Sequence, residues 1–261
     1  MTMQRVLFHS TIFGPIHSRR LGASLGVNLS PTDGKICTFD CLYCEAGYNA
    51  QGPGSSGLPR RDEVARQLEA KLAEMKTAGE RLDVITFSGN GEPTIHPEFE
   101  GIIDDVIALR DKCYPAVKIS VLCNSTRLAD EGVRRALLKV DNNILKLDSA
   151  IDSTMRLIDR PGSPAFNCEE VTRQIAAFGD RCIVQTMLLR GEDDEGRTID
   201  NTTPAEIDAL IEAYKRIRPA EVMLYSIDRP TPARGLRKVE RDELERVAAL
   251  IREAGIKVQV S

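Results

Sequence analysis

The stretch Lys35-Ile-Cys-Thr-Phe-Asp-Cys-Leu-Tyr-Cys-Glu45 holds three of the chain's seven cysteines, Cys37, Cys41 and Cys44, in the spacing C-x3-C-x2-C. A loop this short can place three thiolates on one metal centre. Structural zinc sites and most iron–sulfur centres take four protein ligands. Three thiolates therefore leave one position open, and that position can bind something that is not protein.

The alternatives to an iron–sulfur centre at these cysteines are a disulfide and a zinc site. A disulfide is disfavoured because the number of cysteines is odd and no secretory signal is evident. A zinc site would need a fourth ligand, and the available histidines are His9, His17 and His96. The spacing favours an iron–sulfur centre, with zinc as the alternative. The remaining cysteines show no ligand spacing and are predicted to be buried thiols: Cys113, Cys123, Cys168 and Cys182.

The composition is that of an ordinary globular protein, with 42% hydrophobic and 28% charged residues among 261. The net charge of −4 gives no overall attraction to nucleic acid, although it is compatible with a local basic patch. No stretch approaches a membrane span, and the first residues do not resemble a signal peptide. Free thiols without a targeting segment lead us to expect a cytoplasmic protein.

Strand and helix patterns alternate along the chain. The predicted strands are 26–29, 83–87, 117–122, 143–147, 182–188 and 221–225, with a last short strand at 257–260. The predicted helices are 61–78, 97–111, 130–139, 168–178, one that opens at Thr203-Pro-Ala-Glu206, and 240–254. Six successive strand–helix units predict a parallel sheet with helices outside it.

The predicted fold class is therefore α/β, a partial (β/α)6 barrel of the TIM type, because a full barrel needs two more units. We expect one domain over 1–261, with an N-terminal extension at 1–25 and a C-terminal strand at 256–261. The cysteine loop follows the first strand, and Ser88-Gly-Asn-Gly-Glu-Pro93 follows the second. Both segments should therefore lie at the carboxyl edge of the sheet, where such folds carry their chemistry.

Two motifs resemble the radical S-adenosylmethionine (SAM) superfamily. One is the C-x3-C-x2-C loop with Tyr43 before its last cysteine, and the other is the Gly-Asn-Gly-Glu-Pro segment. The flanking segments are similar to the branch that includes the tRNA wyosine-base synthetases: Gly14-Pro-Ile-His-Ser-Arg-Arg-Leu-Gly22, Gly26-Val-Asn-Leu29 and Arg229-Pro-Thr-Pro232. No cysteine precedes Cys37, so the second cluster of the wyosine enzymes has no counterpart here.

The resemblance implies a 4Fe–4S cluster on Cys37, Cys41 and Cys44. Its fourth iron would bind the amine and carboxylate of SAM. Electron transfer from a donor such as flavodoxin or ferredoxin would then cleave SAM to a 5′-deoxyadenosyl radical, which abstracts hydrogen from a substrate. The protein's share is binding, orientation and exclusion of water.

Candidate SAM-binding residues follow the ends of successive strands. Around the methionine amine we expect Gly89, Asn90, Gly91 and Glu92, since glycine permits close backbone approach and a carboxylate can bind an ammonium group. The resemblance also implies residues that bind the ribose, the methionine carboxylate and the adenine of SAM. These are Tyr43, Asn124, Asp148, Ser149, Gln185 and Met187. The simpler interpretation of each is an interior polar residue bonded to a neighbour.

Ile-Asp-Arg-Pro occurs twice, at 158–161 and at 227–230. Proline restricts the preceding residue to extended geometry, which could direct Arg160 and Arg229 toward the carboxyl edge of the sheet. The aspartate of each copy could lie beside its arginine. This arrangement predicts an anionic substrate; the alternative is two unrelated turns with solvated arginines. The acidic loop 191–196 is expected to be a mobile lid or a solvated loop.

The sequence does not identify a catalytic residue or a substrate. The candidates are a nucleoside or tRNA, an anionic small molecule, or a glycine of a partner enzyme that becomes activated. A zinc-stabilised binding module or a cluster carrier is the non-enzymatic alternative.

Overall fold

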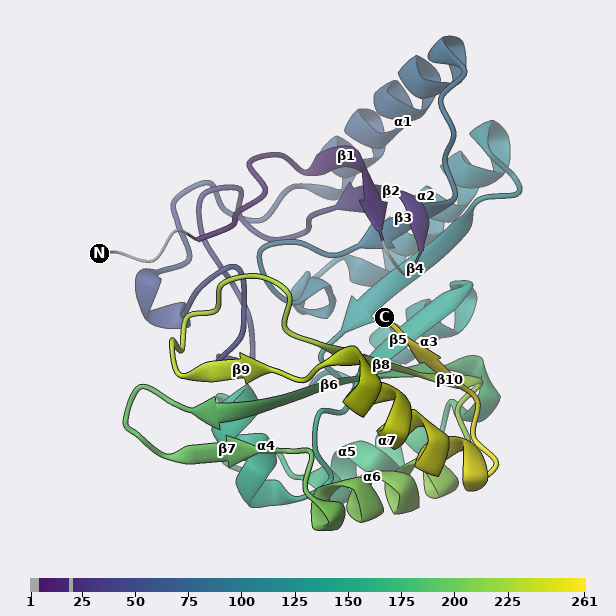
Figure 1. The fold of residues 1–261 in the computed structure, drawn as a ribbon. Coiled ribbons are helices and arrows are strands. Elements are labelled where there is room, and N and C mark those ends of the chain that lie inside the picture. Colours follow the sequence, from purple (N-terminus) through teal and green to yellow (C-terminus); the bar gives the residue numbers. More distant parts are fainter. Residues whose placement is uncertain (1–4, 19–20) are drawn as a thin grey trace.

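The computed structural model describes residues 5–18 and 21–261. Its strands form one sheet with the order β1-β2-β3-β4-β5-β6-β8-β10 (Figure 1). Six neighbouring strands run parallel: β2 (Gly22–Val27), β3 (Val84–Phe87), β4 (Lys118–Cys123), β5 (Asn142–Lys146), β6 (Ile183–Glu192) and β8 (Glu221–Ser226). β10 (Val258–Val260) continues the parallel order, and β1 (Ile12–Ser18) joins antiparallel to β2.

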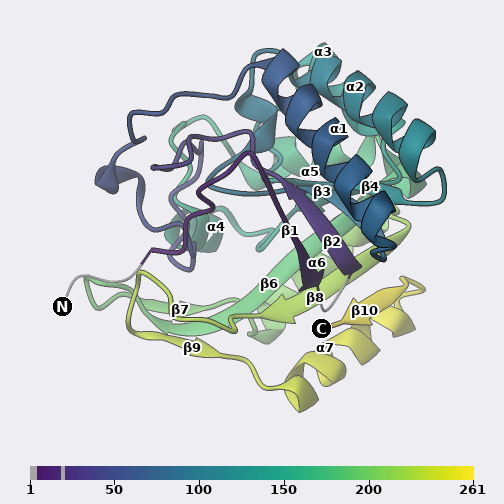
Figure 2. The same cartoon turned by 90° about the horizontal axis from the view of Figure 1, so that it is seen from above.

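Helices cover the outer face of this sheet (Figure 2). They are α1 (Arg61–Ala78), α2 (Phe99–Cys113), α3 (Glu131–Lys139), α4 (Asp152–Asp159), α5 (Cys168–Ala176), α6 (Pro204–Ile217) and α7 (Arg241–Glu253). Side-chain caps define several starts: Asp130 accepts backbone N–H bonds at α3, Asn167 at α5 and Thr203 at α6. The apolar faces of the helices and the strands between them form the main core.

The predicted α/β partial barrel is confirmed, and the sheet is unclosed in the described part of the chain. The first strand was expected at 26–29, whereas β2 begins at Gly22 and ends at Val27. β1 was not predicted, because its sequence Ile-Phe-Gly-Pro-Ile-His-Ser lacks a regular apolar alternation and its middle is exposed. Residues 1–4 and 19–20 of the expected N-terminal extension lie outside the described residues.

β6 is longer than predicted and runs beyond the other parallel strands. Its end pairs antiparallel with β7 (Thr198–Asp200) and β9 (Leu236–Lys238), which the sequence did not reveal because each has three residues (Figure 1). We call these three strands the β7–β6–β9 extension. A second apolar core packs the cysteine loop against it, formed by Leu42, Ile158, Met187, Leu189, Ile199, Ala233 and Leu236.

Within the described residues, no helix has the length and apolarity needed to cross a membrane.

Candidate active site

The cysteine loop and the glycine-rich segment meet directly at the carboxyl edge of the sheet. Ile36 and Gly91 form a parallel bridge, in which Ile36 N donates to Asn90 O at 3.1 Å and Glu92 N donates to Ile36 O at 3.0 Å. A Cβ atom on Gly91 would lie 1.8 Å from Ile36 O. Glycine is therefore required here by the close approach of two backbones. The expectation that the two motifs share one edge of the sheet agrees with this arrangement.

The opposite side of the cysteine loop is held by the first Ile-Asp-Arg-Pro copy. Leu42 N donates to Ile158 O at 2.9 Å, and Asp40 N donates to Asp159 O at 3.0 Å. Phe39 and Pro161 form an antiparallel bridge. This copy therefore positions the loop through its backbone, a role that side-chain reasoning did not anticipate.

Neutral donors surround Cys37. Asn124 Nδ2 lies 3.5 Å from Cys37 Sγ and donates to Thr38 Oγ1 at 2.8 Å, and Phe39 N lies 3.4 Å from the same sulfur. Burial raises the pKa of the Cys37 thiol to about 11. N–H groups directed at the sulfur would stabilise it as a metal-bound thiolate, which counters this cost.

Glu92 is buried, and its carboxylate accepts hydrogen bonds from two segments on the Cys37 side of the site. Its Oε1 accepts bonds from Thr94 N at 3.1 Å and from Thr94 Oγ1 at 2.6 Å, and its Oε2 accepts from Asn124 N at 2.7 Å. Burial raises the pKa of this carboxyl group. Glu92 thus joins the glycine-rich segment to the end of β4.

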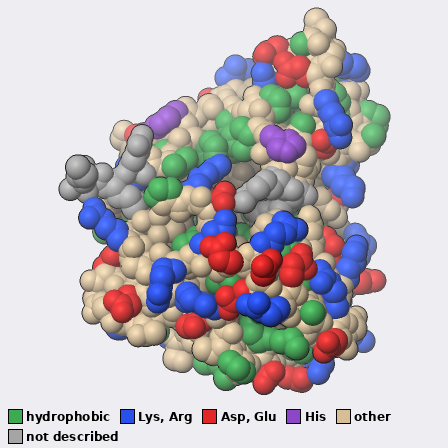
Figure 3. Space-filling model, viewed as in Figure 1, with side chains coloured by type: hydrophobic (Ala, Val, Ile, Leu, Met, Phe, Trp, Pro, Cys, Tyr) green, Lys and Arg blue, Asp and Glu red, His purple; other side chains and the backbone are tan. Residues whose placement is uncertain are grey.

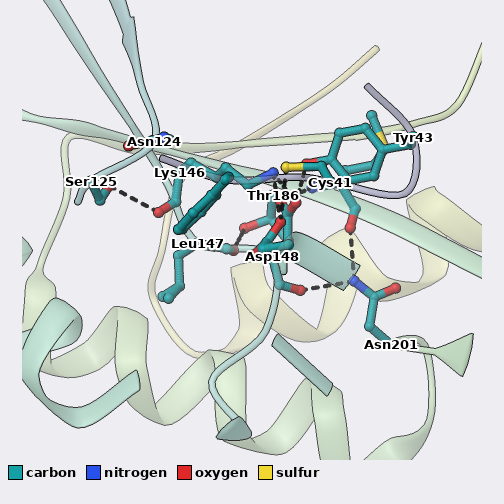
Figure 4. Close-up of polar contacts among 12 residues, drawn as sticks. Cys41, Tyr43, Asn124, Ser125, Lys146, Leu147, Asp148, Thr186 and Asn201 are labelled. Carbon is teal, nitrogen blue, oxygen red and sulfur yellow. Dashed lines mark hydrogen bonds and ion pairs between the residues drawn. The ribbon is translucent and has the colours of Figure 1, made fainter. Parts of the chain in front are cut away.

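Charged groups surround Cys41 (Figure 4). Lys146 Nζ lies 2.5 Å from Asp148 Oδ2 and 2.9 Å from Asp159 Oδ1, and both carboxylates are almost completely buried. Asp159 Oδ1 lies 3.6 Å from Cys41 Sγ. Burial disfavours the Lys146 cation, but the two carboxylates outweigh burial and raise the pKa of Lys146. The sequence instead paired Asp159 with Arg160, and that expectation is wrong.

Tyr43 belongs to the same charged network. Its hydroxyl donates to Asp148 Oδ2, and its ring lies 4.4 Å from Lys146 Nζ. Asp148 Oδ1 accepts from Met187 N at 2.8 Å, and the Asp148 carbonyl accepts from Asn201 Nδ2 at 2.8 Å (Figure 4). Asp148 therefore connects the cysteine loop to the base of the β7–β6–β9 extension.

Two of the predicted SAM ligands have buried side chains that are bonded within the protein. The Asn90 amide accepts from Phe8 N and donates to the carbonyls of Phe8 and Pro31, all at 2.8 Å. Ser149 is fully buried, and its hydroxyl donates to Glu206 Oε2 at 2.7 Å. Both side chains thus have internal hydrogen-bond partners, which agrees with the simpler interpretation of an interior polar residue, and their role as SAM ligands stays a prediction.

The two predicted β6 ligands have different surroundings. Gln185 is paired in the sheet with Lys146 on one side and with Met223 on the other. Met187 packs in the second core together with Leu42. Gln185 and Met187 therefore face the same side of the sheet as Lys146, and Met187 packs in the apolar core that contains Leu42 of the cysteine loop.

The two arginines of the repeated motif have separate carboxylate partners. Arg160 lies 3.6 Å from Asp193 Oδ2, with its guanidinium 5.5 Å from the Tyr48 ring centroid. Arg229 pairs with Glu45 at 2.5 Å and remains 58% exposed. Asp228 pairs with Lys238 at 3.2 Å, so the expectation that it holds Arg229 is wrong. The two guanidinium groups do not share a common partner.

The loop 191–196 is tied down by a buried carboxylate. Asp193 Oδ1 accepts from Glu195 N at 3.0 Å and from Arg197 N at 2.9 Å, and Oδ2 accepts from Arg197 Nε at 2.7 Å. Tyr48 donates to Asp194 at 2.8 Å and thereby links the cysteine loop to this hairpin end.

Sequence reasoning missed Lys35. Its side chain is 1% exposed, and Nζ donates to Gly47 O at 2.7 Å and lies 3.4 Å from Asp40 Oδ1. A lysine after a Pro-Thr-Asp-Gly turn would ordinarily be solvated, and only its position two residues before Cys37 hinted at another role.

A cavity of about 230 Å³ lies on the inner side of the sheet. Ser24 and Thr86 contribute hydroxyl groups to its wall, and Ile144 and Met223 contribute apolar groups. Glu45, Asp228 and Arg229 also line it. Arg160 is not among its lining residues, so only the second motif copy borders this space.

The zinc alternative would need a fourth ligand, and one of its three candidate histidines, His96, has both ring nitrogens engaged. His96 Nε2 lies 2.8 Å from Pro59 O, and its Nδ1 accepts from Glu98 N, so both nitrogens are engaged. The N–H groups near Cys37 Sγ are donors of the kind that stabilise a cluster thiolate, so the residues present are compatible with such a group.

Comparisons with known proteins give a related sequence and solved structures of the same fold over most of this chain. A UPF0026 protein of Helicobacter pylori is 30% identical over 240 residues, which are 89% of this chain and 71% of that protein. A radical SAM methyltransferase from Sphaerobacter thermophilus has the same fold with a TM-score of 0.65 at 19% identity, over 91% of this chain and 65% of that one. A structure of TYW1 with a lysine-pyruvate adduct bound gives 0.60 at 17% identity, over 88% of this chain and 73% of that one.

The family model of the radical SAM superfamily matches residues 32–202. That range is more than half of the chain and includes both the cysteine loop and the glycine-rich segment. The chain belongs to the radical SAM superfamily.

Proposed function

We propose that this protein binds a 4Fe–4S cluster through Cys37, Cys41 and Cys44 and cleaves SAM reductively to abstract hydrogen from an anionic substrate. The bridge between Ile36 and Gly91 carries the proposal, because it joins the residue before Cys37 to the segment expected to receive the methionine moiety. A cluster with one iron free of cysteine supplies a site for the SAM amine and carboxylate, together with the electron that cleaves a carbon–sulfur bond. A small redox protein such as flavodoxin or ferredoxin is the proposed reductant.

The chain's own residues would bind and orient SAM around the cysteine loop. The proposed contacts are the backbone at Gly89 and Gly91, the amide of Asn124 and the side chains of Tyr43 and Asp148. Glu92 holds Asn124 and the glycine-rich segment in register. Gln185 faces the same side of the sheet as Lys146 and stays in the proposed set. Met187 would act through packing under Leu42.

The aromatic contact can be tested by SAM binding to anaerobically cluster-loaded protein. Tyr43→Ala should weaken SAM binding about tenfold, since an aromatic contact contributes roughly 0.5–1.5 kcal/mol beyond burial. Tyr48→Ala is the matched control, because Tyr48 belongs to the same loop but bonds to Asp194. Equal loss of SAM affinity in both variants would remove Tyr43 from the ligand set.

The substrate proposal now rests on Arg229. An exposed ion pair contributes little, so a carboxylate or phosphate could displace Glu45 from its guanidinium group. Lys, Arg, Asp and Glu side chains are intermingled on the face shown in Figure 3, which favours a small anion over a long nucleic-acid contact there.

A panel of short carboxylic acids and nucleoside monophosphates should include compounds that increase 5′-deoxyadenosine release. Arg229→Ala and Arg229→Lys should raise the concentration needed for half-stimulation about tenfold, because lysine lacks the guanidinium fork. Arg237→Ala, on exposed β9, is the control. Stimulation only by tRNA, with steep salt dependence, would replace the small-anion proposal.

A further inference from the structure

The cysteine loop encloses a buried lysine whose charge is only partly neutralised. Lys35 Nζ donates to Gly47 O at 2.7 Å, and its carboxylate partner is Asp40 at 3.4 Å. Asp40 is 27% exposed, and its Oδ1 also accepts from Asn49 N at 2.7 Å. Water and a second donor therefore weaken the hold of this carboxylate on the ammonium group.

The ammonium group and the three cysteines lie within one small loop. Gly47 N donates to Cys44 O, and Cys44 N donates to Cys41 O, so the carbonyl that binds Lys35 belongs to the turn after the last cysteine. The Lys35 ammonium group therefore lies at the turn that carries Cys41 and Cys44, and its own backbone is two residues from Cys37. Its position beside the proposed cluster ligands follows from this geometry.

Lys146 provides the contrast. It has two carboxylates at 2.5 and 2.9 Å, and both are buried. Lys146 is therefore paired directly with two buried carboxyl groups, whereas Lys35 has one partly exposed carboxylate at a longer distance. More of the Lys35 charge is left without a direct counter-charge.

We infer that Lys35 is a positioning residue that sets the reduction potential of the cluster through its charge. The inference rests on the proposed function, since it needs a cluster on the three cysteines. Reduction takes one electron from the reductant and adds one negative charge to the cluster. A fixed cation in a poorly solvated loop stabilises the more negative state and so raises the potential. Lys35 does not contact SAM or substrate in this role.

The charge can be removed while a hydrogen-bond donor is kept. In Lys35→Gln the ratio of reduced to oxidised cluster, measured by EPR at a fixed potential, should fall about tenfold, because one nearby unit charge is lost. For a one-electron couple, tenfold corresponds to a shift of about −59 mV. Lys35→Arg should keep the unsubstituted ratio, and Lys112→Gln, which alters an exposed helix lysine, is the control.

Asp40, the carboxylate partner of Lys35, gives an independent test in which the reduction potential should shift in the opposite direction. Asp40→Asn keeps an acceptor for Asn49 N but removes the negative charge beside Lys35, so the reduced fraction should rise. This variant tests the inference even if Lys35→Gln does not fold. Failure of the unsubstituted protein to bind iron and sulfide would contradict the proposed function itself. A loaded cluster whose potential is unchanged in Lys35→Gln, or is lowered in Asp40→Asn, would overturn the inference about Lys35.

Discussion

The two sides of the cysteine loop are built from different chemistry. On the Cys37 side, the sulfur accepts from neutral N–H groups, and Glu92 ties the backbone of Asn124 to the glycine-rich segment. On the Cys41 side, Lys146 binds two buried carboxylates, and one of these lies beside the sulfur. The Cys37 side is held by close backbone contacts and neutral hydrogen bonds. The Cys41 side is held by an ion pair between Lys146 and buried carboxyl groups.

This difference indicates how each side should respond to substitution. A neutral hydrogen bond contributes about 0.5–1.5 kcal/mol, so its loss is tolerated. Removing one member of a buried ion pair leaves uncompensated charge and costs about 3–5 kcal/mol. Loss of a cysteine should be equally damaging on both sides, because cluster binding needs all three.

The largest expected effect is therefore the loss of the cluster. Cys37→Ala and Cys41→Ala should both fail to retain the roughly four irons per chain that the unsubstituted protein binds after anaerobic reconstitution. Cys113→Ala, on the outer helix α2, should bind iron normally. Iron and sulfide analysis with the absorption spectrum measures this. Normal iron content in Cys37→Ala or Cys41→Ala would contradict the assignment of these cysteines as cluster ligands.

Lys146→Met should show the greatest loss of folding stability. Two buried carboxylates would lose their cation, and the free energy of unfolding of the metal-free protein should fall by about 3–5 kcal/mol. Asn124→Ala, on the Cys37 side, should lose about 1 kcal/mol.

Lys139→Met is the matched control for Lys146→Met, because Lys139 also contacts two carboxylates but lies at the surface. Its loss should be below about 1 kcal/mol. Urea unfolding measures all three variants. Similar losses in Lys146→Met and Asn124→Ala would remove the distinction between the two sides.

Gly91→Ala tests the backbone contact on the Cys37 side. The new Cβ would collide with Ile36 O, so we expect about 1–3 kcal/mol of destabilisation together with weaker cluster retention. Gly162→Ala is the control on the opposite side, since its Cβ would lie at an ordinary 3.4 Å from Thr38 O. Unchanged stability and iron content in Gly91→Ala would show that the loop can move away without loss.

The smallest effect concerns the acidic hairpin end. Burial opposes ionisation of Asp193, but the N–H donors of Arg197 and Glu195 outweigh it and lower the pKa of this carboxyl group. A carboxyl with a lower pKa in the folded state stabilises that state above its unfolded pKa. This stabilisation disappears as the pH falls below about 4.

NMR titration of the Glu195 and Arg197 amide signals should therefore give a midpoint below the ordinary carboxyl pKa. The titration should be absent in Asp193→Asn. A midpoint at or above the ordinary value would mean that the hairpin end is not held by this carboxylate.

Much of the fold follows from the sequence, because the six parallel strands carry strong apolar runs and the helices carry regular apolar faces. β7 and β9 do not, since three residues give no pattern and pairing with the end of β6 decides their conformation. The same limit applies to β1, whose exposed centre resembles a loop.

The motifs of the site could be located from sequence, but the partners of its charged side chains could not. Asp159 is adjacent to Arg160 in sequence, yet the fold turns it toward Lys146, thirteen positions earlier. Asn90 and Ser149 lie within correct motifs but bond to Phe8 and Glu206. These partners come from distant segments, and only the packed structure brings them together.

The most direct test of the proposed activity is reductive cleavage of SAM. Anaerobically reconstituted, dithionite-reduced protein should slowly release 5′-deoxyadenosine and methionine in equal amounts from SAM, even without substrate, and Cys41→Ala should release neither. Cluster-loaded, reduced protein that binds no SAM and forms no 5′-deoxyadenosine would contradict the account.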